Sequence, residues 1–125
     1  MLSLARWLIL LASILLFAAG LMHVIGYSFV LSALVKSGVE SPIIGAVKAV
    51  LFVLTVELVL LGPAFVWISL CSGARPLLLY LALIPVIDDV LMYHFVKLFI
   101  GNYLVAGGAL LLLAGAWILP HADLQ

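Results

Sequence analysis

Residues 48–75 read KAVLFVLTVELVLLGPAFVWISLCSGAR, and this stretch decides the class of protein. Between Lys48 and Arg75 the only strongly ionisable side chain is Glu57, so the apolar run exceeds the ~20 residues that cross a ~30 Å hydrocarbon core. A charge at that depth costs roughly 2.5–3.5 kcal/mol on an insertion scale, which makes an ionisable residue there a candidate functional group. The stretch predicts a transmembrane helix with an acid near its middle.

Three further apolar runs are long enough to do the same. The four expected spans are approximately 4–34, 42–70, 76–98 and 102–119, within a single domain over residues 1–125. Hydrophobic residues make up 69% of the chain and charged residues 8%, and the mean hydropathy of +1.50 excludes a water-soluble globule. Because the connections are short, sequential helices should be antiparallel neighbours. The predicted fold is all-α, an integral membrane four-helix antiparallel bundle with up-down-up-down topology.

Charge and cysteine content exclude several function classes. Five basic and five acidic residues cancel, so the chain has no basic patch for nucleic acid and no polybasic segment for anionic headgroups. Cys71 is the only cysteine and cannot form an internal disulfide. The sequence contains no Gly-rich phosphate loop, no nucleophile elbow and no CxxC pair. We therefore expect membrane lipid as a partner, and no nucleic acid.

The N-terminal run has a second interpretation. Arg6 precedes an apolar stretch, and Ala18-Ala19-Gly20 is similar to the cleavage site of a secretory signal. The run continues to Val35, however, well past the roughly 7–15 residues of a signal's apolar core. A first transmembrane helix is the better interpretation.

Proline and glycine predict the helix boundaries. Ser41 is expected to cap the second helix, with Pro42 in its first turn. Gly73 is expected to follow the end of that helix, and Pro76 to open the third. Pro63 and Pro85 lie inside helices and predict kinks beside the acidic groups.

Aromatic residues distinguish the two ends of the bundle. In an up-down-up-down arrangement Trp7, Trp67 and Trp117 fall at one end, which we call the tryptophan end, as in an interfacial belt. The residues expected at the other end, the lysine end, are Lys36, Lys48, Lys97, Tyr27 and Tyr103.

Small residues recur every seven positions on two of the expected helices. The two stripes are Ala5, Ala12, Ala19, Gly26 and Ala33, and Gly101, Gly108 and Gly115. Small side chains let helix backbones approach closely in lipid, and a period of seven favours a left-handed crossing. We expect the spans 4–34 and 102–119 to pack along these stripes. The alternative is that one stripe forms a homodimer contact.

Six polar residues make up the candidate binding site: Glu57, Asp88, Asp89, His23, His94 and Asn102. With a rise of 1.5 Å per residue, Glu57 lies ~15 Å and the aspartates ~18 Å from the tryptophan end, near the midplane. The two histidines and Asn102 lie ~22–27 Å from that end. This order predicts a polar cavity open toward the lysine end.

Helical phase limits how many of these groups converge. At 100° per residue, Asp89, Tyr93 and Lys97 share a face, whereas Asp88 and His94 lie on its opposite flanks. Structural interpretations also stand beside the functional ones. His23 can hydrogen-bond between helices, lysines at helix ends can snorkel, and Asn102 can be a turn residue.

Three functions fit these residues. The first is binding and translocation of a small cationic or protonatable solute, linked to protons, because desolvation lets a buried carboxyl group keep its proton near neutral pH. The second is a membrane-embedded isomerase, cyclase or hydratase that uses an acid from this set with His23 or His94 as base on a lipophilic substrate. The third is an accessory subunit of a membrane complex.

A metal and a cofactor are not predicted, because the third span has no Asp/His pair at i, i+3 or i, i+4. A homo-oligomer is expected, since four spans make a thin wall around a pathway. The expected location is an integral, multi-pass position in a membrane.

Overall fold

The structure is a computed structural model that describes residues 3–96 and 100–120. Its helices are α1 (Leu4–Lys36), α2 (Ser41–Ser69), α3 (Ala74–Leu81), α4 (Leu83–Val96) and α5 (Ile100–Ile118). The described part is all-helical, as predicted, and contains no strand. Four segments in it are long and apolar enough to cross a membrane: Leu4–Lys36, Ser41–Ser69, Ala74–His94 and Ile100–Ile118. This is consistent with a multi-pass membrane protein.

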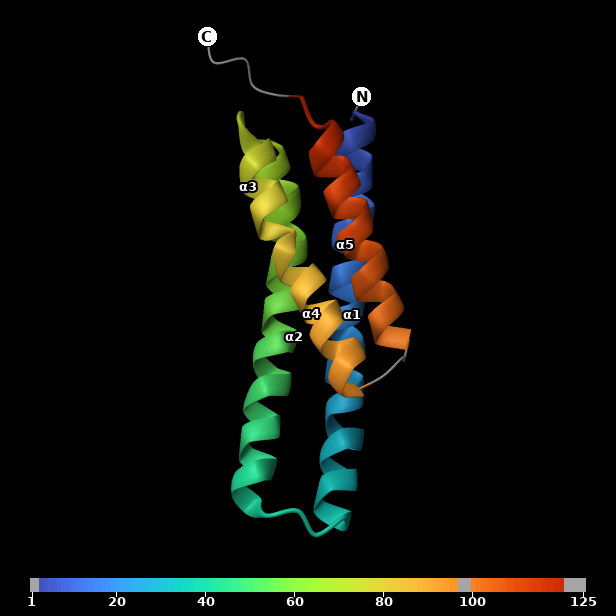
Figure 1. The fold of residues 1–125 in the computed structure, drawn as a ribbon, viewed down its shortest axis with the longest axis vertical. Helices are drawn as coiled ribbons and strands as arrows, with labels where there is room; N and C mark the ends of the chain where they lie inside the picture. Colours follow the sequence, from blue (N-terminus) through green and yellow to red (C-terminus); the bar gives the residue numbers. More distant parts are fainter. Residues whose placement is uncertain (1–2, 97–99, 121–125) are drawn as a thin grey trace.

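The helices differ in length, and the shape of the molecule follows from that difference. The 33 residues of α1 extend for ~50 Å and the 19 residues of α5 for ~29 Å. α1 lies along both α2 and α5, α3 packs on α5 and α2, and α4 packs mainly on α5 (Figure 1). The α1–α2 hairpin consequently extends well past the ends of α4 and α5 (Figure 1).

Proline and glycine account for the break in the third span and for its start. α3 ends at Leu81, and α4 begins at Leu83, so that Pro85 occupies the first turn of α4, where its missing N–H breaks no helical bond. The sequence predicts a kink here, and the structure has a change of helix. Gly73 lies between α2 and α3 with φ +69°, a left-handed conformation that favours glycine.

Two boundary details differ from the sequence predictions. Ser41 is the first residue of α2, and the preceding Glu40 takes the capping position without a side-chain hydrogen bond. The prediction that Ser41 caps this helix is therefore wrong, because the helix starts one residue earlier than the Ser-Pro pattern indicates. α3 begins at Ala74, so Pro76 lies in its first turn and does not open it. α2 continues through Pro63 as one helix, and the kink predicted there stays a prediction.

The seam between α1 and α5 is built on the predicted small residues. A Cβ at Gly115 would lie 2.9 Å from the Ala5 carbonyl oxygen, and one at Gly108 would lie 3.3 Å from that of Ala12. Such distances leave room only for hydrogen, so the two backbones touch. The predicted packing of these two spans is confirmed over this part of the seam.

The stripe is not used over its whole length. Ala5, Ala12 and Ala19 are buried, whereas Ala33 is exposed and a Cβ at Gly26 would meet nothing within 4 Å. The reason is that α5 begins at Ile100, opposite the middle of α1. The last third of α1 faces no part of α5, although the sequence repeat continues through it.

These contacts predict a large difference between two glycine substitutions. Gly115→Ala should lower the free energy of unfolding by about 2 kcal/mol, because the added methyl group meets a backbone oxygen that cannot move alone. Gly26→Ala, the matched control, adds the same methyl group to open space and should be neutral or slightly stabilising. Unfolding by sodium dodecyl sulfate in mixed micelles, followed by circular dichroism, measures both. Equal effects of the two substitutions would contradict the seam.

Contacts between α1 and α2 are close in the same way. A Cβ at Gly62 would lie 2.9 Å from the Ser13 carbonyl oxygen, and one at Gly20 would lie 2.8 Å from Val59 Cγ2. α1 is therefore held on both sides by glycine contacts. α1 is thus the helix that both α2 and α5 contact most extensively.

Candidate functional site

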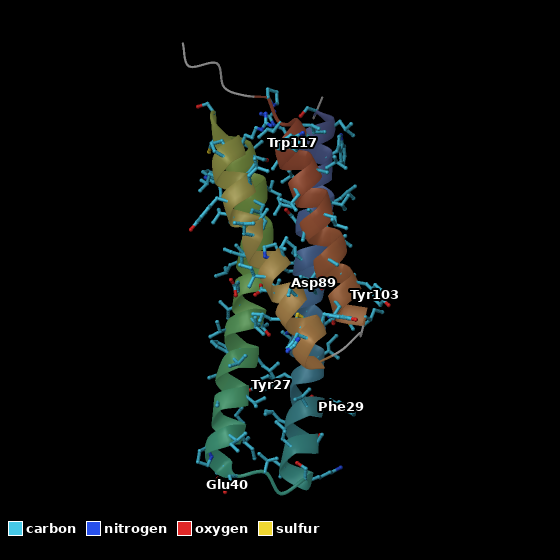
Figure 2. The ribbon with its side chains drawn as sticks, in the orientation of Figure 1. Tyr27, Phe29, Glu40, Asp89, Tyr103 and Trp117 are labelled. Atoms are coloured by element: carbon cyan, nitrogen blue, oxygen red, sulfur yellow. The ribbon has the colours of Figure 1, made fainter. Side chains whose placement is uncertain are left out.

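Each of the four spans contributes a polar side chain to the middle of the bundle. We call these five residues the central polar cluster: His23 of α1, Glu57 of α2, Asp88 and Asp89 of α4, and Asn102 of α5. Asp88 is 9% exposed and Asn102 is 3% exposed, and the other three are partly buried. Asp89 lies near half-height of the molecule (Figure 2). These groups are charged or polar and lie where the rest of the bundle is apolar.

Packing along α1 explains why His23 and Asn102 lie at the same level. Ile9 and Leu16, seven residues apart, place their side chains over Gly115 and Gly108 of α5. The same seven-residue step from Leu16 leads to His23 on α1, and from Gly108 to Gly101 on α5. By this spacing His23 is expected at the next knob position of the seam, at the level of Gly101 and of the adjacent Asn102.

The acidic groups of α2 and α4 interact across the bundle. The carboxyl groups of Glu57 and Asp88 are close enough for their charges to repel each other. The neighbour of Glu57, Leu58, contacts the position of Gly20 on α1, so Glu57 lies about one turn from the level of His23. Tertiary structure thus brings an α2 acid to an α4 acid that is 31 positions away along the chain.

Several buried atoms of this cluster have no hydrogen-bond partner among the residues that the structure describes. They are His23 Nδ1 and Nε2, Asp88 Oδ2, Asp89 Oδ1, and Asn102 Nδ2 and Oδ1. Buried polar atoms are almost always paired in folded proteins, so each exception requires an explanation. Here they come from three helices and include both donors and acceptors. Such a set can bind a small polar or cationic group, or pass a proton.

Asp88 and Asp89 are not equivalent. Asp88 is the more buried of the two and feels the charge of Glu57, whereas Asp89 is only partly buried. Adjacent helical residues point about 100° apart, so the pair cannot face one ligand together. The sequence alone does not distinguish the two aspartates. In the structure Asp88 is the one that is buried and on which the charge of the α2 acid acts.

One other candidate, His94, lies away from the cluster. His94 is exposed near the end of α4, beyond the aspartates. Lys97, expected on the face of Asp89, lies outside the described residues. Tyr103 lies at about the height of Asp89, whereas Tyr27 is nearer the α1–α2 loop (Figure 2). The two tyrosines therefore do not share one level, because α5 starts far from the tip of the long hairpin.

Asn102 belongs to a helix and not to a turn. It is the third residue of α5, and both atoms of its amide are buried without a partner within the described ranges. The turn interpretation of Asn102 is therefore wrong. The Gly-Asn pair was the misleading signal, since it occurs in turns more often than inside transmembrane helices.

The central polar cluster forms neither a metal site nor one of the two best-formed pockets of the described part of the chain. No group of three or more His, Cys, Asp or Glu side chains in the described part is arranged to hold a metal ion. Two pockets are found, one of ≈ 240 Å³ at the tryptophan end and one of ≈ 230 Å³ between Ser13 and Gly62. Neither is lined by the cluster, so the predicted polar cavity remains a prediction.

Sequence reasoning missed a second group of polar residues at the tryptophan end. Arg6 entered it only as a residue before an apolar stretch, and Arg75 only as the end of another. In the structure the Arg75 guanidinium lies over the Trp117 ring, 5.1 Å from its centroid, and Arg6 lines the pocket at this end. The signal in the sequence was that each arginine lies at the same helix ends as the tryptophans.

The unpartnered amide of Asn102 leads to a stability prediction. Asn102→Leu replaces a buried, unpartnered amide by an apolar side chain of similar shape, so the variant should be at least as stable as the parent, by up to about 1 kcal/mol. Thermal unfolding in mild detergent measures this. Ala109→Leu is the contrasting control, because it enlarges a buried side chain and should destabilise. A loss of more than about 1 kcal/mol in Asn102→Leu would indicate that the amide is hydrogen-bonded.

Comparison of the chain with models of known protein families, with curated proteins and with solved structures gives no match. The functional argument therefore rests on the residues themselves. Its basis is the central polar cluster, with two interacting acids and unpartnered atoms from three helices.

Proposed function

We propose that this chain is an integral, multi-pass membrane protein whose antiparallel four-helix bundle binds and translocates a small cationic or protonatable solute in exchange for protons. Glu57 and Asp88 are the exchanging groups in this proposal. His23, Asp89 and Asn102 supply further polar atoms along the path. The solute is defined by its chemistry: a small cation, bound by carboxylate oxygens.

The observation that carries the proposal is the electrostatic interaction of Glu57 with Asp88 inside an apolar bundle. Two carboxylates of like charge are unfavourable neighbours in a medium of low dielectric constant. Their repulsion is relieved when one of them is protonated or when a cation binds between them. Both states reduce the negative charge of the pair, so a cation and a proton compete for it.

The exchange step follows from this competition. When the solute approaches the protonated pair, the carboxylic O–H bond breaks, the proton passes to water, and the carboxylate oxygen binds the cation. In the reverse direction a proton displaces the cation. Buried atoms of His23 and Asn102 that have no partner among the described residues offer the next polar contacts.

Oligomerisation belongs to the proposal. Large apolar side chains of the projecting α1–α2 hairpin are exposed: Ile25, Phe29, Val30, Val35, Ile43, Val50, Phe52 and Val53. A bundle of four spans has little protein on the outer side of its polar groups. A second copy would supply that wall and keep the pathway away from lipid. We therefore propose a homodimer or a higher homo-oligomer.

Proton flux in vesicles tests the proposal. The protein is reconstituted in liposomes that contain the pH indicator pyranine, and choline, tetramethylammonium or ethidium is added outside. These quaternary cations cannot cross as neutral bases, so any coupled proton movement requires protein. The expected result is proton efflux on addition of at least one of them. Absence of flux with all three, from protein shown to be folded by circular dichroism, would reject translocation of organic cations.

Unpartnered ring nitrogens of His23 favour one alternative, a membrane-embedded acid–base enzyme. A histidine without a partner can accept a proton from a lipophilic substrate while a nearby carboxylic acid donates one. Native mass spectrometry from mild detergent separates the alternatives, because it reports stoichiometry and co-purified molecules together. A co-purified lipophilic compound that the protein converts would indicate the enzyme. A constant unrelated subunit would indicate an accessory role.

A further inference from the structure

We propose a second, separate site: the pocket at the tryptophan end binds a phosphate group, with Arg6 as its charged donor. The inference is independent of cation translocation, since it concerns other residues at another level of the bundle. A phosphate group reaches such a site either as the headgroup of an anionic phospholipid or as free inorganic phosphate. The experiment below distinguishes these two sources.

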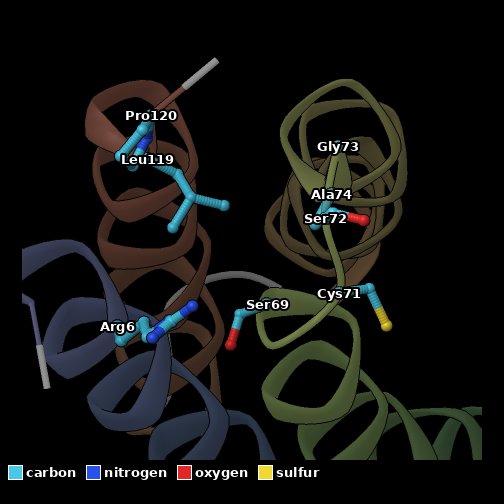
Figure 3. A pocket seen from close by; sticks show the side chains of 8 residues that line it. All are labelled: Arg6, Ser69, Cys71, Ser72, Gly73, Ala74, Leu119 and Pro120. Atoms are coloured by element: carbon cyan, nitrogen blue, oxygen red, sulfur yellow. The ribbon is translucent and has the colours of Figure 1, made fainter. Parts of the chain in front are cut away.

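The pocket lies between the two halves of the bundle. It has a volume of ≈ 240 Å³ and is lined by Arg6 of α1 and by Leu119 and Pro120, which follow α5, on one side, and by the α2–α3 connection with its flanking residues on the other. Arg6 extends from α1 toward Ser69, while the side chains of Cys71 and Ser72 point away from it (Figure 3). The arginine is therefore the group that a bound anion would meet.

The guanidinium of Arg6 is incompletely paired. Its Nε is buried and has no hydrogen-bond partner in the described part of the chain. A guanidinium presents five donors in a planar fork that matches the oxygens of phosphate. Ser69 is 3% exposed, and its hydroxyl proton is already donated to the Val66 carbonyl oxygen at 2.7 Å. Arg6 is therefore the side chain that would donate hydrogen bonds to an anion in the pocket. A phosphate oxygen at Nε would satisfy this buried group.

Charge at this end favours an anion. Arg75 adds a second positive charge, and its Nε is also buried without a partner among the described residues. The carboxylates that the structure describes lie elsewhere, with Glu40 at the tip of the long hairpin and the others in the middle of the bundle. Asp123 lies outside the described residues. The field in the pocket is thus positive, and the start of α3 at Ala74, which no side chain caps, adds to it.

The level of the pocket matches the headgroup region of a bilayer. Trp7, Trp67 and Trp117 mark this end and are 51%, 73% and 66% exposed. Exposed tryptophans of membrane proteins concentrate at the membrane–water interface, where phosphate groups lie. The sequence has no polybasic segment, but folding brings two arginines of separate helices, Arg6 and Arg75, to this end of the bundle. They form a discrete site only in the folded chain.

Quenching of tryptophan fluorescence tests the proposal. The full chain is reconstituted in phosphatidylcholine vesicles that contain either brominated phosphatidylglycerol or brominated phosphatidylcholine. Bromine quenches tryptophan at short range, and the three tryptophans lie at the end that holds the pocket. We expect the phosphatidylglycerol to bind about fivefold more tightly than phosphatidylcholine, since charge-assisted bonds to Arg6 are made in both cases but only the former has net negative charge.

Matched variants assign the preference to the pocket. Arg6→Gln should abolish the preference, so that both lipids bind about equally. Lys36→Gln makes the same change of charge at the other end of the bundle and should leave the preference near fivefold. Arg6→Lys should retain at least about twofold, because the charge remains while the planar fork is lost. Circular dichroism verifies that each variant is folded. Equal losses of the preference in Arg6→Gln and Lys36→Gln would overturn the proposal. Such a result would mean that the preference comes from the net charge of the protein and not from the pocket.

Inorganic phosphate provides the second arm. In a neutral detergent, 10 mM phosphate should raise the melting temperature of the parent but not of Arg6→Gln if the site takes free phosphate. Lipid preference without this effect identifies the headgroup as the source. An absence of both effects in the parent protein would overturn the proposal.

Discussion

Glu57→Gln is expected to abolish cation-dependent proton flux in the pyranine assay, to the level of protein-free vesicles and by at least about tenfold. Glutamine keeps the shape of the side chain and loses the exchangeable proton. It also removes the repulsion of Asp88, so the variant should unfold at the same or a higher temperature than the parent. If Glu57 exchanges protons, the variant should lose flux and remain stable. If Glu57 has only a structural role, loss of flux should be accompanied by loss of stability.

Glu40→Gln is the matched control for this variant. The control makes the same replacement of a carboxyl group by an amide at an exposed position between α1 and α2. Its flux should equal that of the parent. If Glu57→Gln retained the parent's flux, or if both variants lost it equally, the proton-exchanging role of Glu57 would be rejected.

Asp88→Asn is expected to have nearly the same effect as Glu57→Gln, while Asp89→Asn should reduce flux by no more than about threefold. The reason is their different surroundings: Asp88 is the more buried and feels the charge of the α2 acid, and Asp89 does not share that interaction. Two charges that exchange one proton act as a unit, so the double variant Glu57→Gln with Asp88→Asn should be no worse than either alone. Initial rates of proton efflux at a fixed cation concentration measure the three variants.

The neighbouring aspartate serves as the control in this comparison. Asp88 and Asp89 lie in the same helix at nearly the same level, so depth in the membrane and helix propensity are matched. A larger loss of flux in Asp89→Asn than in Asp88→Asn would contradict the assignment. It would place the pathway on the other face of α4.

Much of the fold was predictable because the information is local. Apolar length identifies four spans, and the seven-residue repeat of small residues identifies α1 and α5 as partners. The limit of that repeat was not predictable. Gly26 and Ala33 continue it in α1, but their partner would have to come from residues before Ile100, where α5 has not yet started.

The candidate site was predictable as a set of residues and not as an arrangement. Glu57, Asp88, Asp89 and Asn102 stand out in sequence because each interrupts an apolar run. Which of the adjacent aspartates faces α2 depends on the rotation of α4 about its axis. That rotation follows from packing after the break at Ala82, and helical phase alone leaves it open.

The sequence by itself determined the all-helical class, the positions of four apolar spans and the identity of the polar residues within them. These properties depend on composition and on spacing along one helix. Tertiary structure alone decided that the charge of Glu57 acts on Asp88 across the bundle, that Ile9 and Leu16 pack over Gly115 and Gly108 in the α1–α5 seam, and that Arg6 lines a pocket at the tryptophan end. The physical reason is that contacts between helices depend on their relative register and rotation, which are set by packing of residues distant along the chain.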